Sequence, residues 1–281
     1  MKTSNNSRDT LEVVFLGTSG AIRVPSFPSH CEACAEATRT PRARRLRSTL
    51  GIFGRENLIF DCGPDMGQII SEYDISSIAR VFLTHWHADH VFGLGDLDHY
   101  AILARVQKIP IFIHEELLAE FQNVYGFTQR LEAIPFKVKV EIVTPDMTIV
   151  PLYANHETLT VGYFLIPRER SSTLAYFPDT RFLPEETVAY LRNKVTTLII
   201  DGTWGSTYPT INEKVVTRGH LTIADAAREA RKINSQRTLI THISPHTFQE
   251  GTLKVQKLKF LEEVADSHGV ELAYDGMRFT I

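Results

Sequence analysis

The sequence predicts a mixed α/β (α+β) fold in which two mixed β-sheets pack face to face with helices on the outside. Short apolar runs, typical of buried strands, alternate with amphipathic stretches, typical of helices, along all 281 residues. No Pro/Gly/Ser-rich linker and no sharp change in composition divides the chain. We therefore expect one domain over residues 1–281, with a flexible polar tail at residues 1–10.

The expected strands are short, apolar and bounded by turn residues. In chain order they are Leu11–Gly17, Thr49–Phe53, Asn57–Asp61, Arg80–Thr84, Ile109–Ile113, Phe136–Val143, Met147–Tyr153, Val161–Ile166, Thr173–Phe177, Thr196–Asp201 and Thr238–Thr241, followed by two short strands at the end of the chain. Helical periodicity predicts helices over Ile223–Ile233, with Thr222 as the N-cap, and over Leu253–Ser267. Two further helical stretches flank Ile109–Ile113.

Composition and charge exclude several classes of protein. Hydrophobic residues make up 43% of the chain and charged residues 22%, as in ordinary globular proteins. The net charge of −3 argues against a strongly basic surface that wraps nucleic acid, but it is compatible with a small phosphate ester as ligand. No apolar run is long enough to span a membrane, and the N-terminus lacks the apolar core of a signal peptide, so we expect a cytoplasmic protein.

Four candidate metal ligands lie within six residues, directly after an apolar strand: His85, His87, Asp89 and His90. Residues two apart share a face of an extended chain, so His85 and His87 can reach one point while Asp89 and His90 reach a second. Imidazole nitrogen and carboxylate oxygen suit zinc, manganese or iron. The alternative is a surface loop that happens to be rich in histidine, and this order of residues after a strand makes it much less favoured.

Three further candidate ligands, His156, Asp179 and His242, follow other apolar strands. Alone, each would be more typical of an ordinary loop residue than of a ligand. Together they supply additional imidazoles and a carboxylate that can bridge two ions, which is what a two-metal site requires.

The order of these residues resembles the metallo-β-lactamase superfamily, whose H-x-H-x-D-H motif matches residues 85–90. The resemblance implies an αββα sandwich with a dinuclear metal site. The implied ligands are His85, His87 and His156 for one ion and Asp89, His90 and His242 for the other, with Asp179 bridging both. Asp61 matches the superfamily aspartate that orients a ligand, and an ordinary turn residue at a strand end is the alternative.

Cys31 and Cys34 have the C-x-x-C spacing that lets two thiolates hold one ion. An odd total of three cysteines, with Cys62 as a buried thiol, fits metal binding in a reducing compartment better than a disulfide framework. A redox dithiol or two buried thiols are the alternatives. A structural zinc would need about two more ligands.

Further segments resemble the PhnP-type phosphoribosyl cyclic phosphodiesterases, in the tRNase Z-like branch of the superfamily. The matching segments are residues 15–21, 24–25, 31–34, 240–244 and 274–277. That family carries a structural zinc held by three cysteines and a histidine. Cys31, Cys34 and His246 match three of those ligands, whereas the remaining family cysteine has no counterpart, and the adjacent His30 is the candidate replacement.

The resemblance implies a metal-dependent phosphoric diester hydrolase with two Zn²⁺ or Mn²⁺ ions, in which a hydroxide shared by the ions attacks phosphorus. The implied substrate is a small cyclic phosphodiester such as 5-phosphoribosyl 1,2-cyclic phosphate, which would place the enzyme in phosphonate metabolism. A tRNase Z-like nuclease or cyclic-nucleotide phosphodiesterase is the alternative, and a catalytically silent metal-binding scaffold is the non-enzyme alternative. Nucleic acid is the less favoured partner, no membrane partner is expected, and the family likeness is compatible with a homodimer.

Two catalytic residues and one substrate-binding residue complete the expected site. Asp89 would be both a ligand and the acceptor of the nucleophile's proton. His220 matches the general acid of the phosphodiesterase branches, and the ordinary histidine pKa of about 6.5 suits that role. Arg218 would bind a non-reacting phosphate through its guanidinium. The alternatives are a helix-capping role for His220 and a solvated surface position for Arg218.

Overall fold

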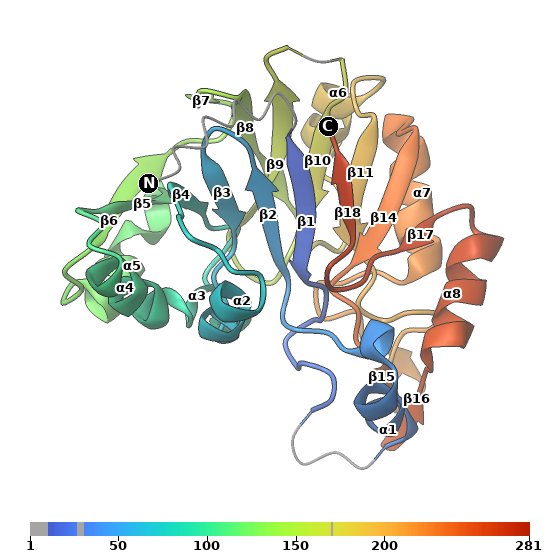
Figure 1. Ribbon diagram of the computed structural model, residues 1–281. Helices are drawn as coiled ribbons and strands as arrows, with labels where there is room; N and C mark the ends of the chain where they lie inside the picture. The colour runs from blue at the N-terminus through green and yellow to red at the C-terminus, as the bar shows by residue number, and fades with distance from the viewer. Residues whose placement is uncertain (1–10, 27–30, 170) are drawn as a thin grey trace.

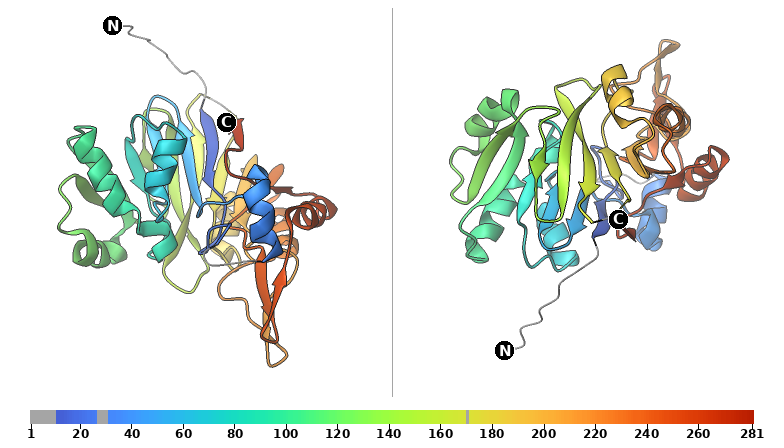
Figure 2. Two further views of the ribbon diagram at one scale, coloured as in Figure 1. Left: turned by 60° about the horizontal axis from the view of Figure 1, so that its bottom comes forward. Right: turned by 90° about the horizontal axis from the view of Figure 1, so that it is seen from above.

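Two seven-stranded β-sheets face one another in the computed structural model, which describes residues 11–26, 31–169 and 171–281 (Figure 1). Helices cover the outer faces of both sheets, so that the layers run helix, sheet, sheet, helix (Figure 2). The predicted fold class is therefore confirmed. The expected flexible tail, residues 1–10, lies outside the described residues.

The first sheet joins an antiparallel half to a parallel half. Its strands, in spatial order, are β18 (Arg278–Thr280), β1 (Glu12–Gly17), β2 (Thr49–Phe53), β3 (Asn57–Phe60), β4 (Arg80–Phe82), β5 (Ile109–His114) and β6 (Leu131–Phe136). Pairing is antiparallel from β18 to β3 and parallel from β3 to β6. Val81 and Phe82 of β4 and most of β5 are apolar and buried, because a parallel strand covered on both faces has little side-chain surface exposed to water.

The second sheet has the same mixed character. Its strands, in spatial order, are β17 (Glu271–Leu272), β14 (Arg237–Thr241), β11 (Thr197–Asp201), β10 (Leu174–Phe177), β9 (Thr160–Pro167), β8 (Met147–Ala154) and β7 (Ile142–Val143). Pairing is parallel from β17 to β10 and antiparallel from β10 to β7.

The helices lie outside the two sheets, and none of those described is long and apolar enough to cross a lipid bilayer. They are α1 (Glu32–Arg39), α2 (Met66–Glu72), α3 (Ala88–Val91), α4 (Leu94–Leu103), α5 (Leu118–Tyr125), α6 (Glu185–Leu191), α7 (Ile223–Ile233) and α8 (Leu258–Ser267), with the 3-10 turns η1 (Pro41–Ala43) and η2 (Glu115–Leu117). α7 begins at the predicted N-cap, where Thr222 Oγ1 accepts a hydrogen bond from Asp225 N at 3.2 Å.

Aromatic side chains fill the space between the sheets. The rings of Phe60, Phe82 and Phe112 stack in sequence across the first sheet, with centroids 5.0 and 4.7 Å apart. Tyr163 of the second sheet packs edge-on against Phe60 at 5.3 Å. This apolar core fixes the separation of the sheets and hence the position of the loops at their edges.

Strand directions bring several carboxyl ends to the same edge of each sheet. In the first sheet β1, β3 and β4 run the same way, and in the second sheet β8, β10, β11 and β14 do. The polar residues that follow these strands are therefore delivered to one end of the sandwich, where ligand sites of such folds are commonly found.

Two predicted elements are wrong in their bounds, and a third sheet was not predicted. The expected helix Leu253–Ser267 begins only at Leu258, because residues 252–255 form a strand of the unpredicted sheet. The expected strand Phe136–Val143 is interrupted because Lys139, at φ +62°, turns the chain between β6 and β7. The extra sheet projects from the sandwich (Figure 2) and has the order β13 (Lys214–Val215), β12 (Thr210–Ile211), β15 (His246–Gln249) and β16 (Thr252–Val255).

Candidate metal centre

The histidine-rich loop begins where β4 leaves the first sheet. Thr84 donates hydrogen bonds through N and Oγ1 to Asp61 Oδ1, at 2.8 and 2.9 Å, and Asp61 itself directly follows β3. Asp61 is fully buried and adopts the left-handed backbone conformation, with φ +66°. His85 follows Thr84 immediately, so the loop enters the site in a fixed direction.

Three imidazoles converge on one point. Nδ1 of His87 lies 3.3 Å from Nε2 of His156, and the ligand atoms of His85, His87 and His156 all lie within 4.8 Å of one another. The remaining nitrogens are held by the protein: His85 Nδ1 lies 2.9 Å from Thr84 Oγ1, and His156 Nδ1 donates to Gly219 O at 2.9 Å. His85 Nε2 is buried without a hydrogen-bond partner among the described residues. One anchored nitrogen and one nitrogen directed at a shared point is typical of metal-ligating histidines.

A second group of four ligand atoms lies beside the first. His90 Nε2 is 2.7 Å from Asp179 Oδ2, 3.3 Å from Asp89 Oδ2 and 3.4 Å from His242 Nε2. His242 Nε2 is also 3.3 Å from Asp179 Oδ2. Ligand atoms about 2.1 Å from a tetrahedral zinc lie about 3.4 Å from one another. The spacing of this group therefore fits a cation of that size.

Asp179 lies between the two groups. Its Oδ2 atom is 2.7 Å from His90 Nε2 in the second group and 3.5 Å from His85 Nε2 in the first. Asp179 is almost fully buried after β10. A buried carboxylate at this point could contact an ion in each group, which is the role that the superfamily resemblance implies for Asp179.

The pKa values of the pocket residues are set by their burial and by one another's charges. Burial is the main cause that holds the pKa of His85 well below its usual range, so this imidazole is neutral and can donate its lone pair. Burial alone would raise the pKa of Asp179, but the neighbouring His242 and His90 hold it well below its usual range. Although burial alone would lower the pKa of His90, neighbouring carboxylates, chiefly Asp61, raise it well above its usual range, so a bound cation would take the place of that proton. Carboxylates and imidazoles form a donor set that fits divalent zinc, manganese or iron.

His242 reaches the second group from a strained backbone. It follows β14 with φ +58°, a left-handed conformation that non-glycine residues rarely adopt and that costs about 1–3 kcal/mol. Its Nδ1 lies 2.7 Å from Thr203 Oγ1, which fixes the ring plane. Strain of this kind persists only where surrounding contacts impose it, and it is concentrated at functional sites.

His220 lies beside the two groups, and sequence reasoning missed its partner Asp201. Nδ1 of His220 lies 2.7 Å from Asp201 Oδ2 and 3.0 Å from Asp179 Oδ1. Although burial opposes a positive charge, these carboxylates raise the pKa of His220 to about 10. Asp201 is fully buried at the end of β11. The sequence did contain a signal for Asp201, because it ends an apolar strand, and the same pattern had identified Asp179.

The predicted substrate-binding Arg218 lies on the loop that covers the first group. Arg218 is exposed, with φ +46°, and it precedes Gly219, whose carbonyl accepts the hydrogen bond from His156. Gly219 itself has φ +75°, and a Cβ atom there would lie 2.4 Å from His156 Nδ1. The loop can approach the histidine only because this position is glycine.

The cysteine pair and His246 form a third group, apart from the first two. Cys31 Sγ lies 2.9 Å and Cys34 Sγ 3.8 Å from His246 Nε2. Cys31 is the N-cap of α1, and His246 begins β15 of the small sheet. The predicted fourth ligand, His30, lies outside the described residues. Cys62 is buried in the core beneath α2 and α4, as expected for a structural thiol.

Comparison with known proteins identifies relatives of this arrangement. A family model described as the beta-lactamase superfamily domain matches residues 56–243. An octanoyltransferase of Porphyromonas gingivalis is 26% identical over 244 residues, which cover 84% of this chain but only 46% of that protein. A ribonuclease Z of Halobacterium salinarum is 24% identical over 296 residues, covering 84% of this chain and 87% of the relative.

Among solved structures, a diphosphatase from the PhnP family superimposes with a TM-score of 0.78 at 22% sequence identity, covering 97% of both chains. This likeness shows the same fold. The comparisons also agree with the enzyme class that the sequence predicted, a metal-dependent hydrolase. Because the family model spans more than half of the chain and includes every strand end that carries a candidate ligand, this protein belongs to the beta-lactamase superfamily, with the metallo-β-lactamase sandwich fold.

Proposed function

We propose that this protein is a phosphodiesterase that uses two divalent metal ions, zinc or manganese, to hydrolyse a small cyclic phosphodiester. The observation that carries the proposal is the pair of ligand groups that share Asp179, with His220 beside them. His85, His87 and His156 would hold one ion, Asp89, His90 and His242 the other, and Asp179 both. Bound there, the ions would supply positive charge for the phosphoryl oxygens and lower the pKa of the attacking water.

The protein's own residues would handle the protons. Asp89 Oδ2, which lies 3.3 Å from His90 Nε2 and 3.4 Å from His242 Nε2, would accept a proton from the attacking water. Asp201 accepts a hydrogen bond from His220 Nδ1, which leaves Nε2 as the nitrogen that can give a proton to the departing alkoxide. The same bond holds the imidazole plane in place while the proton moves.

The substrate class is argued from charge and from the relatives. The net charge of −3 favours a small substrate over a long nucleic acid, and the fold likeness to a PhnP-family diphosphatase supports a compact sugar phosphate such as 5-phosphoribosyl 1,2-cyclic phosphate. The exposed Arg218 would contact a second phosphate. A nuclease of the ribonuclease Z type is the second candidate, because several curated relatives carry that name.

Three further features belong to the proposal. Cys31, Cys34 and His246 would hold a structural zinc, with His30 as its fourth ligand. The chain would form one domain and act in the reducing cytoplasm, where thiolates stay available for metal. A homodimer is proposed from the family likeness alone.

One assay separates the candidate functions. Purified protein loaded with zinc or manganese is incubated with 5-phosphoribosyl 1,2-cyclic phosphate, 2′,3′-cyclic AMP and precursor tRNA, and with bis(p-nitrophenyl) phosphate as a generic diester. We expect the highest kcat/KM on the cyclic sugar phosphate. Preferred cleavage of precursor tRNA would favour the nuclease. Bound metal without turnover of any diester would favour the alternative of a catalytically silent metal-binding scaffold.

A further inference from the structure

The segment that follows β1 holds the backbone of His242 in place. Ile243, the residue after His242, donates its backbone N–H to Thr18 O at 2.8 Å, and Gly20 N donates to Ile243 O at 3.4 Å. A Cβ atom on Gly20 would lie 3.2 Å from the imidazole of His242. The backbone of residues 18–20 therefore packs against His242 and holds it in its left-handed conformation.

Thr18 is fixed in turn by a buried polar network. Its Oγ1 donates to Asp275 Oδ1 at 2.7 Å and accepts from Arg45 Nη1 at 2.7 Å. Arg45 Nη1 also donates to Ala273 O at 2.7 Å, and Asp275 Oδ2 accepts from Leu46 N at 2.6 Å. The network ties the end of β1 to residues 45–46 and to the segment before β18, which are far apart in sequence.

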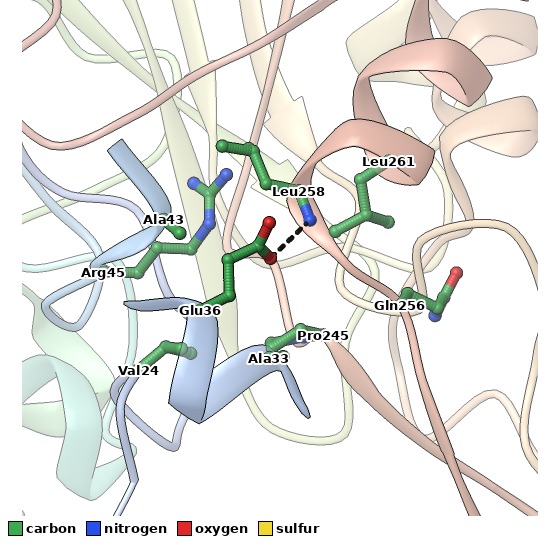
Figure 3. A pocket seen from close by; sticks show the side chains of 9 residues that line it. All are labelled: Val24, Ala33, Glu36, Ala43, Arg45, Pro245, Gln256, Leu258 and Leu261. Carbon is green, nitrogen blue, oxygen red and sulfur yellow. Dashed lines mark hydrogen bonds between the residues drawn. The ribbon is translucent and has the colours of Figure 1, made fainter. Parts of the chain in front are cut away.

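Burial of the charged Arg45 side chain costs free energy. Arg45 is only 3% exposed and lines a small cavity between α1 and α8, with Glu36 beside it (Figure 3). Its Nη2 has no hydrogen-bond partner in the described part of the chain. Burial lowers the pKa of Arg45 to about 10, so the guanidinium is still charged at neutral pH. A buried, incompletely paired cation is a poor source of stability, but it constrains geometry sharply.

We propose that Arg45, Thr18 and Asp275 form a positioning network that sets the direction in which His242 presents Nε2. The inference rests on the proposed metal centre, in which His242 is a ligand. Thr203 fixes the ring plane through Nδ1, whereas Thr18 fixes the backbone through Ile243. Without the second constraint the backbone can relax toward ordinary φ values, and Nε2 leaves the group formed by Asp89, His90 and Asp179.

The test uses Thr18→Val, which removes the hydroxyl and keeps the side-chain shape, and Thr18→Ser, which restores the hydroxyl. Asp146→Ala is the matched control, because Asp146 also accepts backbone hydrogen bonds, from Arg55 and Glu56, but at the turn of the β2–β3 hairpin, away from Asp61 at the end of β3. Zinc affinity per site is measured by chelator competition. Hydrogen exchange at Ile243 is measured in the metal-free protein.

We expect Thr18→Val to weaken one active-site zinc about tenfold to a hundredfold, as loss of a group that orients a ligand usually does. Exchange at Ile243 should quicken as well. Thr18→Ser should match wild type, and Asp146→Ala should lower Tm without changing either readout. Wild-type affinity and exchange in Thr18→Val would overturn the positioning role, as would the same changes in Asp146→Ala. If wild-type protein bound no zinc at the histidine groups, the proposed function would fall, and exchange at Ile243 would decide the network by itself.

Discussion

Asp201 Oδ2 lies 2.7 Å from Nδ1 of His220, and the two residues come from different elements, the end of β11 and the loop before α7. The contact leaves His220 Nε2 as the nitrogen that can deliver a proton. The pair is also joined to the ligand groups, because His220 Nδ1 lies 3.0 Å from Asp179 Oδ1. The proposed proton donor and the candidate metal ligands therefore belong to one connected cluster.

Replacing Asp201 by asparagine should slow turnover about a hundredfold on a diester with an alkyl leaving group, because general acid catalysis typically contributes that much or more. Turnover of bis(p-nitrophenyl) phosphate should change little, since p-nitrophenolate leaves without a proton. The measurement is kcat on both substrates at equal metal content. In the His220→Ala background the same substitution should add no further loss, and equal losses on both substrates would contradict the proton-delivery role.

Removing metal should lower Tm reversibly. Several ionisable side chains, among them His85, His90 and Asp179, are buried together, and bound cations stabilise the native state by mass action. Differential scanning fluorimetry with EDTA, followed by addition of zinc or manganese, measures the change. A protein whose Tm is the same with and without chelator would speak against metal at these groups.

Gly219→Ala should weaken the ion held by His85, His87 and His156. An added Cβ would lie 2.4 Å from His156 Nδ1, and the φ of +75° is unfavourable for alanine, so the loop must move and release the imidazole. Zinc titration measures the loss. Gly251→Ala is the control, because it has φ +77° but no atom within 4 Å of its added Cβ, and it should leave zinc affinity unchanged.

Replacing both Cys31 and Cys34 by serine should remove one zinc per chain and leave the other ions bound. The reason is that their sulfur atoms share His246 Nε2, away from the histidine groups. Metal content by atomic absorption, together with hydrogen exchange in α1 and β15, checks this. Cys62→Ala should keep the full metal count, and an unchanged count in the double serine variant would rule out the structural zinc.

Asp275 should make stability depend on pH. Burial raises its pKa to about 7 from an ordinary value of 3.8, so the folded protein favours the protonated carboxyl. The protonated carboxyl therefore adds to the free energy of unfolding, fully below about pH 4. This contribution, a few kcal/mol, is lost as the pH rises toward 7. Asp275→Asn cannot ionise, so its deficit in unfolding free energy relative to wild type should shrink between pH 5 and pH 8. Urea unfolding of the metal-free proteins measures it, and a deficit that does not vary with pH would refute the assignment.

The sequence by itself determined the features that depend on local pattern. Short apolar runs located strands such as Thr49–Phe53, and helical periodicity after a capping threonine located the helix Ile223–Ile233, because these signals lie within a few residues of the element. The H-x-H-x-D-H motif could be recognised for the same reason, because its residues lie close together in the sequence. The helix prediction was wrong at Leu253, because this stretch forms a hairpin with the preceding strand β15, and β15 is itself paired with the distant strand β12.

Only the tertiary structure decided which separate strand ends meet. The sequence suggested three distant residues as ligands, His156, Asp179 and His242. That they converge depends on parallel pairing within the second sheet and on the aromatic packing that fixes the distance between the sheets. Asp201 and Arg45 act through partners 19 and 27 residues away, Asp201 on His220 and Arg45 on Thr18. No local pattern encodes such pairs, because a hydrogen bond between them forms only after hydrophobic burial has brought separate segments of the chain together.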